Sequence, residues 1–195
     1  HTPFDRVKKM EKHISRQFDS ELNSISSRVL ELGGLVESQI RQAVSALVSF
    51  DVDQANDVIK EEHVVNQMEL DIDRDLSTMI VRRQPAASDL RFLIGISKTT
   101  ANLERAGDEA EKIARMAKAI IEAGVGRRMP VSELQLAAEL ASSILRRSLD
   151  ALARLDAVEA LAIIRADDKI DIEFNGFVRK LVTFMMEDPR AITSS

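Results

Sequence analysis

The stretch NLERAGDEAEKIA, Asn102–Ala114, contains the pattern that decides the fold of this chain. It is typical of a helix, although Gly107 destabilises a helix interior by about 1 kcal/mol relative to alanine. Glu104 and Asp108 also stand four residues apart on one helix face, where like charges repel by about 0.3 kcal/mol. We therefore expect a neighbouring helix that approaches closely at Gly107, and a role for the collected acids.

The residues around this stretch form a helical seam with steps of three and four residues. Its members are Leu93, Ile96, Thr100, Leu103, Gly107, Ala110, Ala114 and Ala117. The same periodicity along the chain predicts helices over 15–50, 53–82, 86–122, 132–155 and 157–187. The prolines at 3, 85, 130 and 189 lie outside these periodic segments.

The composition agrees with long helices. Of the 195 residues, 45% are hydrophobic and only 4% are aromatic, which favours helices over strands. The net charge of −5, with acids and bases interspersed, argues against a nucleic-acid partner. The absence of cysteine excludes a disulfide scaffold and a thiolate metal site. No apolar run approaches the roughly 20 residues of a membrane span.

An internal repeat appears at an offset of 105 residues. VSALVSFDVDQANDVI at 44–59 aligns with LDALARLDAVEALAII at 149–164, and Asp51 aligns with Asp156. Each aspartate is followed three residues later by Gln54 or Glu159, which is the spacing of a capping box at a helix start. We therefore expect two copies of one helical unit that turn the same corner.

The predicted fold class is all-α, with two pseudo-repeated antiparallel three-helix bundles. The loop 123–130 separates a first repeat, 1–123, from a second repeat, 131–195, in which Ser132 and Gln135 have the spacing of a capping box. The second repeat has room for two helices in this chain, and we expect its third helix to lie beyond residue 195. That helix would cover an apolar seam, so we expect self-association through this seam. The seam is formed by Ile144, Leu152, Ile163, Ile170, Phe177 and Leu181.

Acidic residues follow the seams of the second and third helices by one position. Glu104, Asp108 and Glu111 form one stripe. The other comprises Glu62, Asn66, Glu69 and Asp73. Because a short turn makes these helices antiparallel neighbours, both stripes should point into one groove. Asp167 and Asp171 give a weaker stripe on the fifth helix.

Two interpretations of the stripes stay open. They are solvated faces if Asp108 pairs with Lys112 and Glu111 with Arg115, at the favourable i,i+4 spacing. They are a site for a hard or borderline cation if the carboxylates ligate it, because all-oxygen ligation suits Mg, Ca, Mn or iron. Glu69, with Asp73 at i+4 in place of a base, favours the cation.

The basic cluster at the turn between these helices consists of Arg82, Arg83 and Arg91, and is either a solvated junction or a docking site for a partner. We assign no catalytic residue. A carboxylate-bridged redox or hydrolytic metal enzyme is the rival interpretation, but the chain has no Glu-x-x-His pair of the di-iron type. A purely structural bundle would pair its acids with bases at i+4.

Several segments, in order along the chain, resemble the PhoU family of phosphate-transport accessory proteins and phosphate-signalling regulators. They are HISRQFDSEL at 13–22, LGGLVE at 32–37, RRQPAASDLR at 82–91, NLERAGDEAEKIA at 102–114 and LVTFMMEDPRAI at 181–192. The family's acidic signature is Glu or Asp, three residues, then Asp. Glu69 with Asp73, Glu104 with Asp108, and Asp167 with Asp171 fit it, whereas Glu62 with Asn66 departs from it.

The resemblance implies a cytoplasmic dimer that is peripherally membrane-associated through its partners. Those partners are the ATP-binding subunit of the phosphate ABC transporter and the sensor histidine kinase of the phosphate-starvation response, both under negative regulation when phosphate is plentiful. It also implies a divalent or ferric ion at the carboxylates in some members. We expect a non-enzymatic adaptor whose metal, when bound, braces the first bundle.

Overall fold

The computed structural model describes residues 3–124, 131–166, 172, 176 and 179. The described helices are α1 (Pro3–Ser49), α2 (Val52–Arg83), α3 (Ala87–Glu122) and α4 (Val131–Arg154), followed by a helical segment at 157–166. No strand occurs in the described part of the chain. The all-α prediction is confirmed in the described residues, and the predicted ends of the first four helices lie within two residues of the observed ones except at the start of α1; the predicted end of the fifth helix, at 187, lies outside the described residues.

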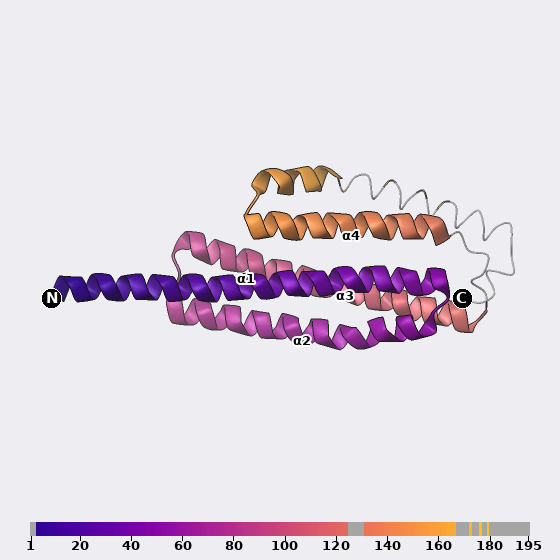
Figure 1. Ribbon diagram of the computed structural model, residues 1–195, viewed down its shortest axis with the longest axis horizontal. Helices are drawn as coiled ribbons and strands as arrows, with labels where there is room; N and C mark the ends of the chain where they lie inside the picture. Colours follow the sequence, from indigo (N-terminus) through magenta and orange to yellow (C-terminus); the bar gives the residue numbers. More distant parts are fainter. Residues whose placement is uncertain (1–2, 125–130, 167–171, 173–175, 177–178, 180–195) are drawn as a thin grey trace.

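Helix α1 begins at Pro3, twelve residues before the predicted start, so His13 lies inside the helix and not ahead of it. Proline is well tolerated in the first turn of a helix, because the amide hydrogen that it lacks has no partner there. At 47 residues, α1 is the longest helix and extends along both repeats (Figure 1).

Helices α1, α2 and α3 pack together as one bundle, and α4 lies against α1 on the side away from α2 (Figure 1). The predicted seams of α2 and α3 face this core: Val65, Ile72, Leu93 and Ala114 are all fully buried. Because α1 contacts α2, α3 and α4, it belongs to the first bundle and also holds the second repeat.

The two copies of the repeat turn the same corner with the same hydrogen bonds. Asp51 accepts a bond from the amide of Gln54 at 3.0 Å, and Asp156 accepts one from the amide of Glu159 at 3.0 Å. The residues before them, Phe50 and Leu155, both have the left-handed backbone, with φ of 57° and 52°. The predicted caps are confirmed at both corners, and the shared conformation extends the repeat from sequence to backbone.

The predicted cap at Ser132 is wrong. Helix α4 includes Val131, so Ser132 lies within its first turn, where its hydroxyl donates to Glu133 at 2.8 Å. A residue that is already helical lacks the extended backbone of an N-cap, which is why the sequence spacing alone misplaced it.

Helix α4 crosses α1 at a glycine. A Cβ atom on Gly33 would lie 2.5 Å from the methyl carbons of Leu149, so the missing side chain lets Leu149 pack onto the α1 backbone. One turn further along α1, the Glu37 carboxylate accepts hydrogen bonds from Arg146 of α4. Glu37 is 8% exposed but Arg146 is exposed, so a partly buried ion pair and a close apolar contact together hold the second repeat on α1.

The second repeat leaves an apolar groove of about 800 Å³ between α3, α4 and the segment 157–166. The seam predicted for this repeat was expected to be exposed, and this is only partly right. Ile144 and Leu152 are half-buried, and Ile163 is buried, with 6% of its surface exposed. Three other apolar residues of the segment are exposed instead, namely Val158, Leu161 and Ile164. The predicted seam residues Ile170, Phe177 and Leu181 lie outside the described residues.

Candidate functional site

Gly107 is a point of close approach between the helices of the first bundle. A Cβ atom there would lie 3.0 Å from Cγ1 of Val65, 3.1 Å from Oε2 of Glu62 and 3.2 Å from Oε1 of Gln39. These three residues come from α2 and α1, so α3 meets both neighbours at its glycine. The close approach expected from the sequence is present.

The first acid at this point, Glu62, is only 4% exposed. Burial raises the pKa of its carboxyl group to about 7, a hydrogen bond from Gln39 opposes that rise, and the charges of Asp108 and Glu111 add to it. One oxygen of Glu62, Oε1, is buried without a hydrogen-bond partner. Carboxylates of α2 and α3 therefore face each other here.

A second group of acids lies further along the same two helices. The pKa of Glu69 is raised, first by burial and then by the charges of Asp73 and Glu104. Ser97 of α3 donates a hydrogen bond to Asp73 at 3.2 Å. Both acidic stripes thus line one α2–α3 groove, in two groups. Asp167 and Asp171 lie outside the described residues.

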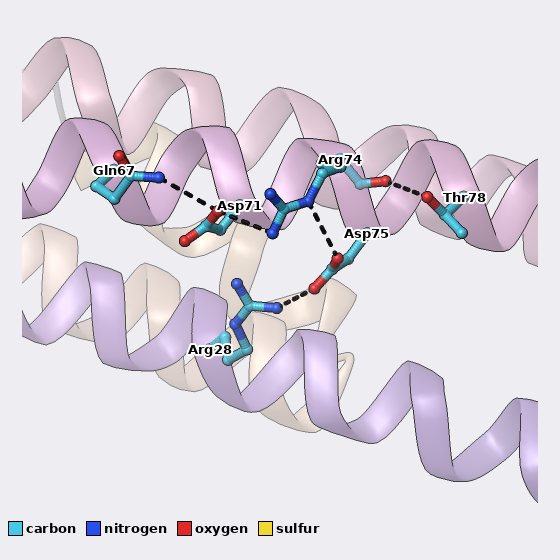
Figure 2. Close-up of polar contacts among 6 residues, drawn as sticks. All are labelled: Arg28, Gln67, Asp71, Arg74, Asp75 and Thr78. Carbon is cyan, nitrogen blue, oxygen red and sulfur yellow. Dashed lines mark hydrogen bonds and ion pairs between the residues drawn. The ribbon is translucent and has the colours of Figure 1, made fainter.

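Among the described residues, acids on the outer surface form ion pairs, whereas most of those in the α2–α3 groove do not. On the outer surface, Arg28 contacts Asp75 at 2.5 Å and Arg74 contacts Asp71 at 3.0 Å, so these acids have basic partners (Figure 2). In the groove, no ion pair within the described residues involves Glu62, Glu69, Asp73, Glu104 or Asp108. Glu111 is the exception, with Arg115 at 2.5 Å.

Asp108 does not form the ion pair with Lys112 that the solvated interpretation requires. Lys112 contacts Glu109 at 2.7 Å, because Glu109 lies on the exposed side of α3 with it, whereas Asp108 is turned toward the groove. The solvated interpretation therefore holds for Glu111, which has Arg115 as its basic partner. It does not hold for Asp108, which has no ion pair with Lys112.

The side-chain oxygens of the groove are of the chemical type that hard cations prefer as ligands. Oε1 of Gln39 lacks a hydrogen-bond partner and lies beside Gly107, Oε1 of Glu62 is also buried without a partner, and the side-chain atoms that could ligate a cation in the groove are all oxygens. Within the described residues, no three His, Cys, Asp or Glu side chains stand in an arrangement that would hold a metal ion. The metal assignment stays a prediction, with Gln39 as a buried donor that the acidic pattern did not identify.

The three arginines of the basic cluster differ in their contacts in the structure. Arg83 donates to Glu21 of α1 at 2.6 Å, and this bond raises the pKa of Arg83 and lowers the pKa of Glu21. It therefore ties the end of α2 to α1. Arg82 and Arg91 are exposed on either side of the turn.

A family model described as the PhoU domain matches residues 29–117 and 134–194. The phosphate-specific transport system accessory protein PhoU homolog of Pseudomonas putida is 46% identical over 93% of this chain and 70% of that protein. The phosphate-specific transport system accessory protein PhoU of Escherichia coli K12 is 45% identical over 95% of this chain and 76% of that protein.

Two solved structures are similar to this chain in fold and in sequence. The crystal structure of PhoU from Pseudomonas aeruginosa has a TM-score of 0.85 and 44% identity, covering 91% of this chain and 84% of that one. The phosphate transport system regulatory protein PhoU from Streptococcus pneumoniae has a TM-score of 0.80 and 29% identity, covering 88% and 80%.

The buried Glu62 predicts a dependence of stability on pH. Its folded pKa of about 7 lies above its ordinary value of 4.5, so the stability gained from its proton is lost as the pH rises from 4.5 through 7. In chelator-treated protein, we expect Glu62→Gln to raise the free energy of unfolding by about 1–3 kcal/mol at pH 8 and to change it little at pH 4.5. Denaturant unfolding at both pH values measures this.

Glu109→Gln is the matched control, because it removes only an exposed ion pair and should change stability by less than about 0.5 kcal/mol at either pH. An equal effect of Glu62→Gln at the two pH values would show that its origin is not the titration of Glu62.

Proposed function

This chain belongs to the PhoU family, and we propose from that premise that it is a regulatory accessory protein of phosphate transport that restrains uptake and the phosphate-starvation response. The supporting observation is identity of about 45% to accessory proteins of the phosphate-specific transport system, over more than nine-tenths of the chain. Its action is a change in partner affinity and needs no catalytic residue.

The proposed partners are the ATP-binding subunit of the phosphate ABC transporter and the sensor histidine kinase, reached from the cytoplasm. None of the described helices is long and apolar enough to cross a membrane. Arg82 and Arg91 support a docking surface at the α2–α3 turn, because both are exposed and neither forms an ion pair with a described residue. Arg83 is not part of this surface, since Glu21 holds it.

Reversing these two charges should weaken binding to an acidic partner surface. We expect Arg82→Glu/Arg91→Glu to retain at least tenfold less transporter ATP-binding subunit in a pull-down, and to derepress a phosphate-starvation reporter. Arg105→Glu, on the exposed face of α3, is the matched control.

If the double variant binds like the control while the wild type binds, the turn is not the docking surface. If the wild type neither binds the subunit or the kinase nor represses the reporter, the regulatory function itself is wrong.

We propose in addition that the α2–α3 groove holds a divalent or ferric ion. The ion would bind either beside Glu62 and Asp108 or beside Glu69, Asp73 and Glu104, whereas Glu111 is held by Arg115 and lies outside the proposed site. A bound cation supplies positive charge to carboxylates whose pKa values burial and mutual repulsion raise. The chain's own contribution is the close approach at Gly107, which brings the acids of two helices together and excludes water from Glu62.

Asp108→Ala should lose the ion. In protein purified without chelator, we expect metal content measured by elemental analysis to fall at least tenfold in this variant. Glu109→Ala, one residue away on the exposed face and paired with Lys112, should match the wild type. Equal metal content in all three proteins would remove the site from the groove.

We also propose self-association of this chain through the second repeat. The segment 157–166 exposes Val158 by 81%, Leu161 by 59% and Ile164 by 68%, beside the apolar groove. An apolar surface of this kind favours association with a second copy, because burying it removes hydrocarbon from water.

Sedimentation velocity measures this association. We expect the wild-type chain to sediment as a dimer or larger species at high concentration, and Val158→Lys/Leu161→Lys to shift it toward the monomer. Val81→Lys, at an isolated exposed valine of α2, is the control. A wild-type monomer throughout the concentration range would contradict the proposal.

A further inference from the structure

The first turns of α1 extend beyond the rest of the first bundle (Figure 1). The bond between Arg83 and Glu21 ties the last turn of α2 to α1 at the level of Glu21. From there α1 continues to Pro3, past the turn that joins α2 to α3, and no other described helix runs beside residues 3–16 (Figure 1). These residues form a projection from the bundle.

The apolar seam of α1 continues into the projection. Ile25 and Val29 of this seam are buried in the core, and Phe18 packs against the same core in a half-buried position. In the sequence, steps of three and four residues extend the seam toward the amino terminus through Ile14, Met10, Val7 and Phe4. The pattern of a buried helix side therefore continues beyond the ends of α2 and α3.

The projection is basic, although the chain as a whole is acidic. Residues 3–16 contain five lysines or arginines and two acids, a net charge of +3 with histidine neutral, whereas the whole chain carries −5. Of the two acids, Glu11 borders the apolar seam and Asp5 falls among the bases. The helical period of 3.6 residues puts most of the bases opposite the seam, namely Lys8, Lys9, Lys12 and Arg16.

A helix with apolar residues along one side and bases along the other is suited to an anionic membrane surface. Its apolar side enters the boundary between headgroups and acyl chains, and its bases are attracted by the negative lipid headgroups. Two copies of this chain that paired along their projections would instead bring two groups of positive charge together. The charge of the projection therefore favours anionic lipid over a second copy.

We propose that residues 3–16 of α1 are a lipid-binding helix that attaches this protein directly to an anionic membrane surface. This goes beyond the proposed function, in which partner proteins bring the chain to the membrane. The helix lies along the surface, because its bases stay at the headgroups. The α2–α3 turn lies at the base of the projection, so attachment also brings Arg82 and Arg91 close to the membrane.

Co-sedimentation of the 195-residue chain with vesicles tests the proposal. The probe is vesicles of phosphatidylcholine with about 30% phosphatidylglycerol, compared with vesicles of phosphatidylcholine alone. We expect at least about tenfold more wild-type chain to sediment with the anionic vesicles at low salt. The bound fraction should fall as salt is raised, because screening weakens the attraction between the bases and the headgroups.

Two double variants separate the contributions of the two sides. Lys8→Glu/Lys12→Glu reverses charge on the basic side, and Val7→Ser/Ile14→Ser removes hydrocarbon from the apolar side. Each should reduce binding to the anionic vesicles by at least about tenfold. The matched control, Lys60→Glu/Arg105→Glu, makes the same change in net charge at exposed positions of α2 and α3 and should bind like the wild type.

The contrary outcomes are distinct. Equal sedimentation of the wild type with anionic and neutral vesicles would overturn the proposal, as would a control that loses as much binding as Lys8→Glu/Lys12→Glu. If the wild type ignores vesicles and Lys8→Glu/Lys12→Glu retains less transporter ATP-binding subunit, the projection docks on an acidic protein and the lipid assignment is wrong. Because the vesicles carry no protein, a failure of the regulatory function would leave this test unaffected.

Discussion

The close packing of α1 and α2 side chains against the backbone of α3 at Gly107 is the constraint on which the first bundle depends. A side chain there would crowd Val65, Glu62 and Gln39 at 3.0–3.2 Å, so the glycine sets how near α3 lies to α1 and α2. The alanines that follow it, Ala110, Ala114 and Ala117, are buried and extend the narrow contact along α3. Because the helices are this close, Glu62 is withdrawn from water, and its pKa rises to about 7.

The bundle therefore has two kinds of charged surface. On the outside, acids alternate with arginines, and each such pair contributes little because water screens it. In the groove, acids face acids, and their repulsion lowers the stability of the free chain. Such unfavourable charge is relieved by whatever neutralises it, as a proton on Glu62 does.

Most of the fold could be predicted from the sequence, because the apolar periodicity and the aspartate caps act locally. The twelve-residue extension of α1 and the position of Ser132 were not predicted, since helix starts depend on backbone geometry that spacing does not fix. On α2 and α3, Glu62 lies close enough to Asp108, and Glu69 to Glu104, for their charges to interact, as the predicted stripes require. Gln39 was not predicted, because the acidic pattern contains no amide residue. Its position three residues after Val36 and four before Ala43, both of which are buried, is the sequence signal of a polar residue on the core-facing side of α1.

Because α1 is long and unbroken, a small rotation at one point of this helix produces a larger displacement at its distant end. At 1.5 Å per residue, its 47 residues form a rod of roughly 70 Å, with Glu37 and Gln39 in its carboxyl-terminal third and Pro3 at its other end. A tilt of about 5° around Gln39 would displace the far end of such a rod by about 5 Å. Motions too small to open the core can thus become visible at a distant surface, without any hinge within the helix.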